Sequence, residues 1–234
     1  MSRPNLSTLD TWGRHENLVL EVFQCALVRL ESESELPEDE SELNRKLYFR
    51  AKEENLRLTR SGRGVRSTII PDSPNLPSDE NAGSRTRESK RPDFQCELID
   101  AQASEYLVYA LECKRLGRPK PSGWVLNRNY TELGVQRFMD PESGYGEGTA
   151  SGAMIGYLQT MSPDETLEEV NDYAQRVKVP PIDRTDGHWI DRGVTRLDQT
   201  LDRTVPPSPF RLRHLWVDLR RYYMTNASRS RAGA

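Results

Sequence analysis

Two apolar runs separated by a short polar connection constrain the fold of this 234-residue chain more than any other feature. The runs are "FQCELI" (94–99) and "YLVYALECK" (106–114), and both are rich in aliphatic and aromatic residues. The connection between them, "DAQASE", has a length typical of a hairpin loop. The sequence therefore predicts a pair of antiparallel strands inside the domain.

Three charged residues interrupt these apolar strands. Asp93 directly precedes the first run, and Glu112 and Lys114 lie at the end of the second. Because side chains alternate across a strand, Glu112 and Lys114 emerge on one face while Cys113 points to the other. A hairpin brings the open ends of its strands together, so we expect two carboxylates and one ammonium at one sheet edge. The alternative is a surface salt bridge, which would stabilise the fold by only ~0–1 kcal/mol.

This combination of charges suits a metal ion. Two carboxylates completed by water and substrate oxygens are the usual way in which proteins hold Mg²⁺. A neighbouring lysine can orient or deprotonate an attacking water and can stabilise negative charge on phosphorus. The group therefore predicts a Mg²⁺ or Mn²⁺ site suited to the hydrolysis of phosphodiester bonds.

Helical patterns flank the two strands. Apolar residues recur at helical spacing in the first of these patterns, and a more exposed helix follows an acidic stretch. At Ser162, a serine, a proline and a glutamate three residues on predict a capping box. The expected elements are helices over 13–30, 42–58, 130–139 and 162–179, an apolar element over 153–160 that fits a strand or a buried helix, and a strand with two covered faces that begins at Phe210.

These elements predict a fold of the α/β (α+β) class, with a central mixed sheet flanked by helices. We expect one domain over residues 1–224. It includes a mobile loop over 71–92, where proline, serine and charged residues replace any periodic pattern, and a disordered tail follows at 225–234.

Charge and cysteine content restrict the setting. The net charge of −3 gives no bulk attraction to nucleic acid, so a polyanion would have to meet a local basic patch. The three cysteines form no close pair and lie among apolar residues, which favours buried thiols and a cytoplasmic location. No apolar run approaches the length of a membrane span or of a signal peptide, so we expect no contact with a membrane.

The motif resembles that of the PD-(D/E)xK nuclease superfamily, and in particular its bacterial restriction and phage-defence members. The matching residues are Pro92-Asp93 and Glu112-Cys113-Lys114. The resemblance implies a restriction-endonuclease-like αβββαβ core, here extended by a C-terminal helix and strand. It also implies that Asp93 and Glu112 bind the metal and that Lys114 positions water. We reject a second Pro-Asp pair, Pro71-Asp72, because no strand follows it directly.

Further residues are assigned through the same resemblance. Many members carry another acidic metal ligand on the first helix, and Glu16 is preferred here to Glu21 because it lies near the helix start. In "YTELGVQRFM", Arg137 is implied to contact phosphate or the carboxylates. The alternative for Arg137 is an ordinary arginine on a helix surface. Arg115 and Lys90 complete the residues expected to bind nucleic acid.

The sequence therefore predicts a Mg²⁺-dependent endonuclease that acts on DNA, with RNA as a possible substrate. A setting in bacterial restriction or phage defence is implied by the resemblance alone. No separate recognition module is visible, so we expect a homodimer or a partner protein such as an ATPase. Two alternatives stay open. One is a catalytically silent subunit with a nuclease fold that serves binding or assembly, and the other is a toxin-like effector that cleaves RNA.

Overall fold

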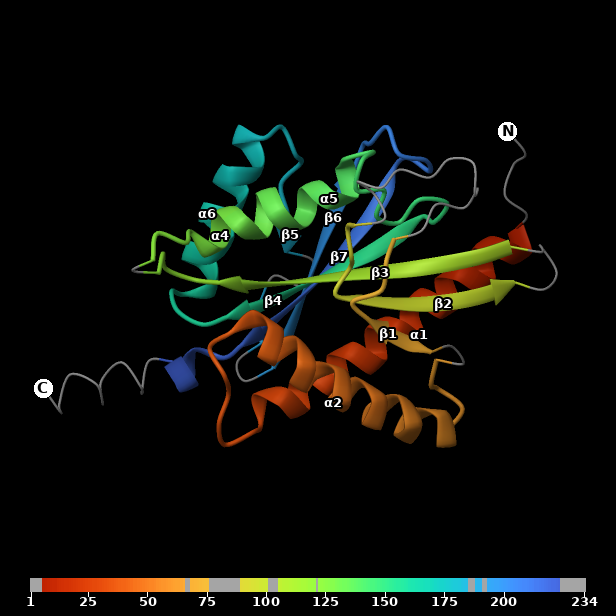
Figure 1. Cartoon of the computed structure of the whole chain (residues 1–234), viewed down its shortest axis with the longest axis horizontal. Coiled ribbons are helices and arrows are strands. Elements are labelled where there is room, and N and C mark those ends of the chain that lie inside the picture. Colours follow the sequence, from red (N-terminus) through yellow and green to blue (C-terminus); the bar gives the residue numbers. More distant parts are fainter. Residues whose placement is uncertain are drawn as a thin grey trace, which may run out of the picture.

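A seven-stranded mixed sheet forms the centre of the described part of the molecule (Figure 1). The computed structural model describes residues 6–65, 68–75, 89–100, 105–120, 122–184, 188–190 and 193–223. The strand order is β1-β2-β3-β4-β7-β6-β5. The strands are β1 (Ile69–Pro71), β2 (Phe94–Asp100), β3 (Glu105–Leu116), β4 (Ser151–Leu158), β5 (Asp183–Arg184), β6 (Val194–Leu201) and β7 (Phe210–Asp218).

Helices cover both faces of this sheet, so the expected α/β class is confirmed. Figure 1 shows two long helices on one side and the shorter helices on the other. Each helical layer packs its own hydrophobic cluster against the sheet. The first layer consists of α1 (Leu6–Glu31) and α2 (Glu40–Arg60), and the second of α4 (Leu126–Tyr130), the π-helical turn η2 (Thr131–Val135), α5 (Gln136–Met139) and α6 (Pro163–Arg176).

The predicted hairpin is present. β2 and β3 pair in antiparallel fashion, with Phe94 opposite Leu111 at the start of β2. β3 then pairs in parallel with β4, and the crossover between them passes through α4, η2 and α5. β3 continues to Leu116, well past the beginning of β2. Among the described residues, no strand therefore covers one edge of the last part of β3.

Several other elements confirm or extend the sequence-based expectations. The apolar element over 153–160 is a strand, β4, and all its residues are buried. The capping box at Ser162 starts α6 as predicted. One helix and one strand were expected after the core. This expectation was incomplete, because two further strands, β5 and β6, lie between α6 and β7. In β6, charged and polar residues interrupt the apolar positions, which weakens its signal in the sequence.

Some expectations fall on parts of the chain outside the described residues. Residues 76–88 of the predicted loop and all of the predicted tail lie there. At the beginning of the loop, Pro71 belongs to β1, and the backbone of Asn75 pairs with that of Lys90. Within the described residues, no helix is long and apolar enough to cross a membrane.

Candidate functional site

The candidate site is built on the uncovered edge of β3. There, two backbone N–H groups point to the side on which β2 pairs with the earlier part of β3. The N–H of Cys113 donates to Asp93 Oδ2 at 2.7 Å, and the N–H of Arg115 donates to Glu40 Oε2 at 3.0 Å. A buried backbone N–H needs an acceptor, and here two carboxylates take the place of a neighbouring strand. The sheet edge itself therefore positions both carboxylates.

The predicted E-x-K pair lies beside them. Lys114 Nζ donates to Glu112 Oε1 at 2.8 Å, to Glu40 Oε1 at 3.0 Å and to the carbonyl oxygen of Cys113 at 2.8 Å. The side chain of Glu112 is 1% exposed and that of Lys114 is 11% exposed. Asp93, Glu112 and Lys114 are thus brought together at the end of the hairpin, as the sequence predicted.

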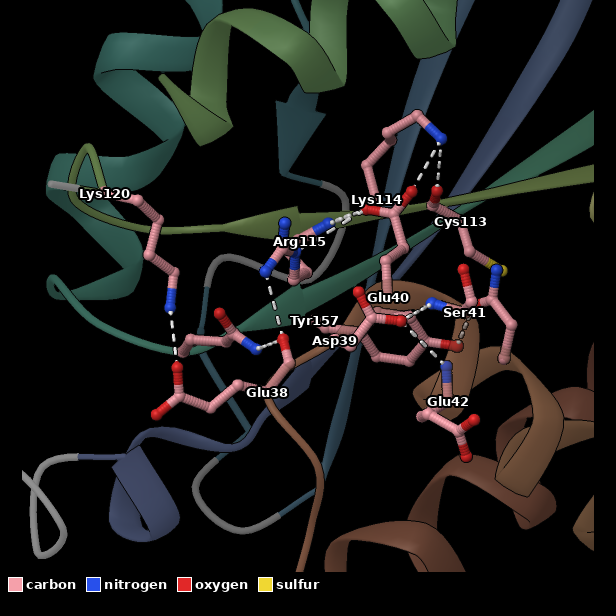
Figure 2. A network of polar contacts seen from close by, with 12 residues as sticks. Glu38, Asp39, Glu40, Ser41, Glu42, Cys113, Lys114, Arg115, Lys120 and Tyr157 are labelled. Carbon is pink, nitrogen blue, oxygen red and sulfur yellow. Dashed lines mark hydrogen bonds and ion pairs between the residues drawn. The ribbon is translucent and has the colours of Figure 1, made fainter. Parts of the chain in front are cut away.

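Glu40 is a member of this group that the sequence reasoning missed. It is the first residue of α2, directly after the N-cap residue Asp39, whose side chain accepts the N–H groups of Ser41 and Glu42. Figure 2 shows the start of α2 below the end of β3, with Glu40 directed toward Lys114 and Arg115. An aspartate followed by acidic residues just before a helical pattern is a helix-start signal, and it could have identified this residue.

The structure does not bring Glu16 into this group. Glu16 is on α1, and its Oε1 accepts a hydrogen bond from Arg213 Nε at 2.9 Å. Glu112 and Lys114 extend from the opposite face of the sheet, because they share the orientation of Ala110, which packs in the α4–α6 layer. Glu21, the other candidate on α1, forms an ion pair with Arg63 at 2.8 Å.

Arg137 reaches the site from α5. Its Nη1 donates to Glu112 Oε1 at 2.6 Å and to the hydroxyl oxygen of Tyr145 at 3.2 Å. The resemblance implies such a contact between Arg137 and a carboxylate of the site. An ordinary arginine on a helix surface would face solvent instead. Arg115 instead directs Nη1 to the carbonyl oxygen of Glu38 at 3.0 Å. Lys90 is half-buried.

Asp93 and Glu112 both have a pKa above the usual value of their carboxyl group. Burial and the nearby charge of Glu112 raise the pKa of Asp93 from its usual 3.8 to about 8. Burial also raises the pKa of Glu112, although Lys114 and Arg137 oppose this shift. Burial alone would lower the pKa of Lys114, but the carboxylates of Glu112, Glu40 and Asp93 raise it above its ordinary value. Burial is thus the main cause that favours the protonated carboxyl groups, while Lys114 stays charged among them.

Glu112 offers a direct test of whether these residues fit a metal ion. Its Oε1 accepts hydrogen bonds from Lys114 and Arg137, whereas its buried Oε2 has no hydrogen-bond partner among the described residues. A buried oxygen without a partner is costly, and a cation at that oxygen would remove the cost. In the described part of the chain, no three or more His, Cys, Asp or Glu side chains form a metal-holding group. A cation held there by Asp93 and Glu112 would therefore need water or substrate oxygens as its further ligands.

No family model, curated protein or solved structure matches the chain. The chemistry of the site, chiefly that of Asp93, Glu112 and Lys114, is therefore what indicates a function.

Proposed function

We propose that this protein is a metal-dependent nuclease of the PD-(D/E)xK superfamily. The observation that carries the proposal is Glu112, a buried carboxylate with one unpartnered oxygen, next to Asp93 and Lys114 at the end of a hairpin. The order of elements adds support, since helices precede β1, β2 and β3, and a helical crossover then leads to β4. This is the order that an αβββαβ core requires.

In this proposal, Asp93 and Glu112 hold Mg²⁺ or Mn²⁺. When bound, the metal supplies positive charge to the phosphate and activates a water molecule. Lys114 remains protonated because its carboxylate neighbours raise its pKa. Its role is therefore to orient the attacking water and to stabilise negative charge, rather than to act as a base. Arg137 holds Glu112 in place through the 2.6 Å contact.

The proposed substrate is DNA, with RNA as the alternative, and the proposed setting is restriction or phage defence in the bacterial cytoplasm. Arg137, Arg115 and Lys90 are the proposed contacts to the nucleic-acid backbone. The net charge of −3 gives little general attraction to nucleic acid. We therefore infer that a second copy of the chain, or a partner protein such as an ATPase, contributes to substrate recognition.

The test is cleavage of plasmid DNA, single-stranded DNA and RNA in Mg²⁺, Mn²⁺ or EDTA. Glu112→Gln should abolish metal-dependent cleavage. Glu54→Gln is the matched control, because Glu54 is also a buried glutamate with two cationic partners, Arg29 and Arg57, but lies in α2 away from the site. Cleavage that persists in EDTA, or that Glu112→Gln leaves intact, would contradict the proposal. A monomer that cleaves DNA efficiently and specifically would contradict the need for a partner.

One observation favours a second candidate function, a silent nuclease-fold subunit that serves binding or assembly. Both oxygens of Asp93 and both oxygens of Glu40 already accept hydrogen bonds from protein donors. A network closed in this way also fits a purely structural role at the strand edge. Calorimetric titration with Mn²⁺ separates the two functions, since only the nuclease should bind the ion at this site.

A further inference from the structure

Asn44 of α2 lies between Asp93 and a buried tyrosine. Its Nδ2 donates to Asp93 Oδ1 at 2.8 Å, and its Oδ1 accepts a hydrogen bond from the hydroxyl of Tyr157 at 2.8 Å. We propose that Asn44 is a positioning residue, which holds the Asp93 carboxylate in the orientation for metal binding and is itself oriented by Tyr157. This inference rests on the proposed function and adds a part to the same site.

The two contacts of Asn44 select one orientation of its amide. An amide has donors only on nitrogen and acceptors only on oxygen, whereas an ionised carboxylate can only accept. The nitrogen must therefore face Asp93 in its ionised form, and the donating hydroxyl of Tyr157 stabilises this orientation. A flipped amide would direct its oxygen at the carboxylate and lose that interaction, and the Tyr157 hydroxyl would then have to accept from the amide nitrogen instead of donating to the amide oxygen.

Asp93 is consequently held at both oxygens. Asn44 donates to Oδ1, and the N–H of Cys113 donates to Oδ2 at 2.7 Å. Each carboxylate oxygen can accept more than one interaction, so both donors leave lone pairs for a cation. Partners of this kind orient the ligands of a metal and contribute strongly to its affinity.

The position of Asn44 on α2 supports a specific role. Asn44 follows Glu40 by four residues, so the two side chains lie on the same face of the helix. Glu40 contacts Lys114 at 3.0 Å, while Asn44 contacts Asp93. One helix face thus contacts the residue directly before β2 and a residue near the end of β3. Tyr157, from β4, is fully buried and gives Asn44 a fixed partner.

The experiment compares Asn44→Leu with Asn55→Leu. Leucine has nearly the shape of asparagine but cannot form its hydrogen bonds. Asn55 is on the same helix, and its side chain also makes two hydrogen bonds, with the N–H of Val65 at 2.7 Å and with its carbonyl oxygen at 3.1 Å. Both variants should lose stability. Only Asn44→Leu should bind Mn²⁺ more weakly in calorimetry, by about 10–100-fold.

Two further measurements separate positioning from a structural role. Tyr157→Phe keeps Asn44 but removes its orienting donor, so it should weaken Mn²⁺ binding less than Asn44→Leu does, and it tests the proposal even if Asn44→Leu fails to fold. At saturating Mn²⁺, Asn44→Leu should lower kcat for DNA cleavage and leave KM unchanged, because Asn44 does not contact the substrate.

The outcomes distinguish this inference from the proposed function. If the wild type binds Mn²⁺ and Asn44→Leu binds it equally well, the positioning role is overturned while the nuclease proposal stands. Equal losses of affinity in Asn44→Leu and Asn55→Leu would likewise reduce Asn44 to a structural residue. If the wild type binds no Mn²⁺ at all, both proposals fall.

Discussion

The raised pKa of Asp93 predicts a specific dependence of stability on pH. Burial and the charge of Glu112 move this pKa from 3.8 to about 8. Between these two values the folded protein holds a proton that the unfolded chain has already released. The free energy of unfolding should therefore fall as the pH rises toward 8. The perturbation that tests this is Asp93→Asn, which keeps the shape of the side chain and removes its titration.

The size of the effect follows from the same shift. A full proton difference between the folded and unfolded states changes the free energy of unfolding by about 1.4 kcal/mol per pH unit. The slope decreases near the folded pKa, so the loss between pH 6 and pH 8 is about 2 kcal/mol. It is absent below the unfolded pKa and complete above the folded one. Asp93→Asn should lack this loss.

The assay is denaturant unfolding of both proteins at pH 6 and pH 8 in EDTA. Two buried histidines also contribute to the pH dependence of both proteins, because burial lowers the pKa of His15 and lowers that of His214 to about 3. Their contribution stabilises the fold as pH rises through the unfolded histidine pKa, which is the opposite sign. It is shared by both proteins, so it cancels in the comparison.

Wild type and Asp93→Asn should differ by about 2 kcal/mol in their change between the two pH values. Parallel changes would refute the reasoning. A bound Mn²⁺ requires the ionised carboxylate, so under the proposed function the ion should stabilise the wild type more at pH 8 than at pH 6.

Three further substitutions test the structure. Glu16→Gln should leave Mn²⁺ affinity unchanged in calorimetry and lower the free energy of unfolding, because Glu16 contacts Arg213 on the other face of the sheet; a weakened affinity would place it at the site after all. Gly152→Ala should lower the free energy of unfolding by about 1–3 kcal/mol, since the added Cβ would lie 2.7 Å from a ring carbon of Phe138. An unchanged midpoint of denaturant unfolding would argue against this packing. Arg203→Leu should lower the free energy of unfolding by about 2–4 kcal/mol, because this buried guanidinium donates to several backbone carbonyl oxygens, that of Phe138 among them. A decrease below ~0.5 kcal/mol would contradict that role.

Much of the site could be predicted because its signals are local. The alternation of a strand places Glu112 and Lys114 on one face whatever the rest of the chain does. A short connection makes an antiparallel pair the expected arrangement, and this brings Asp93 to the same end. The pairing of Pro71 at the end of β1, rather than at the start of a strand, agrees with the rejection of Pro71-Asp72 as the site motif.

Other parts depended on packing between segments that are distant in the sequence. Periodicity shows that α1 and α2 each have a buried side, but it does not show which end of which helix meets the open edge of β3. That choice leaves Glu16 beside Arg213 and places Glu40 at Lys114. The same holds for Tyr157, whose contact with Asn44 joins residues 113 positions apart.

The sequence alone thus determined the α/β class, the central hairpin and the grouping of Asp93, Glu112 and Lys114, because these follow from residue spacing within short segments. The tertiary structure alone decided that Glu40 and Asn44 join them. The reason is that β2 begins opposite the middle of β3, and only the assembled layers reveal which side chains fill the edge that remains open.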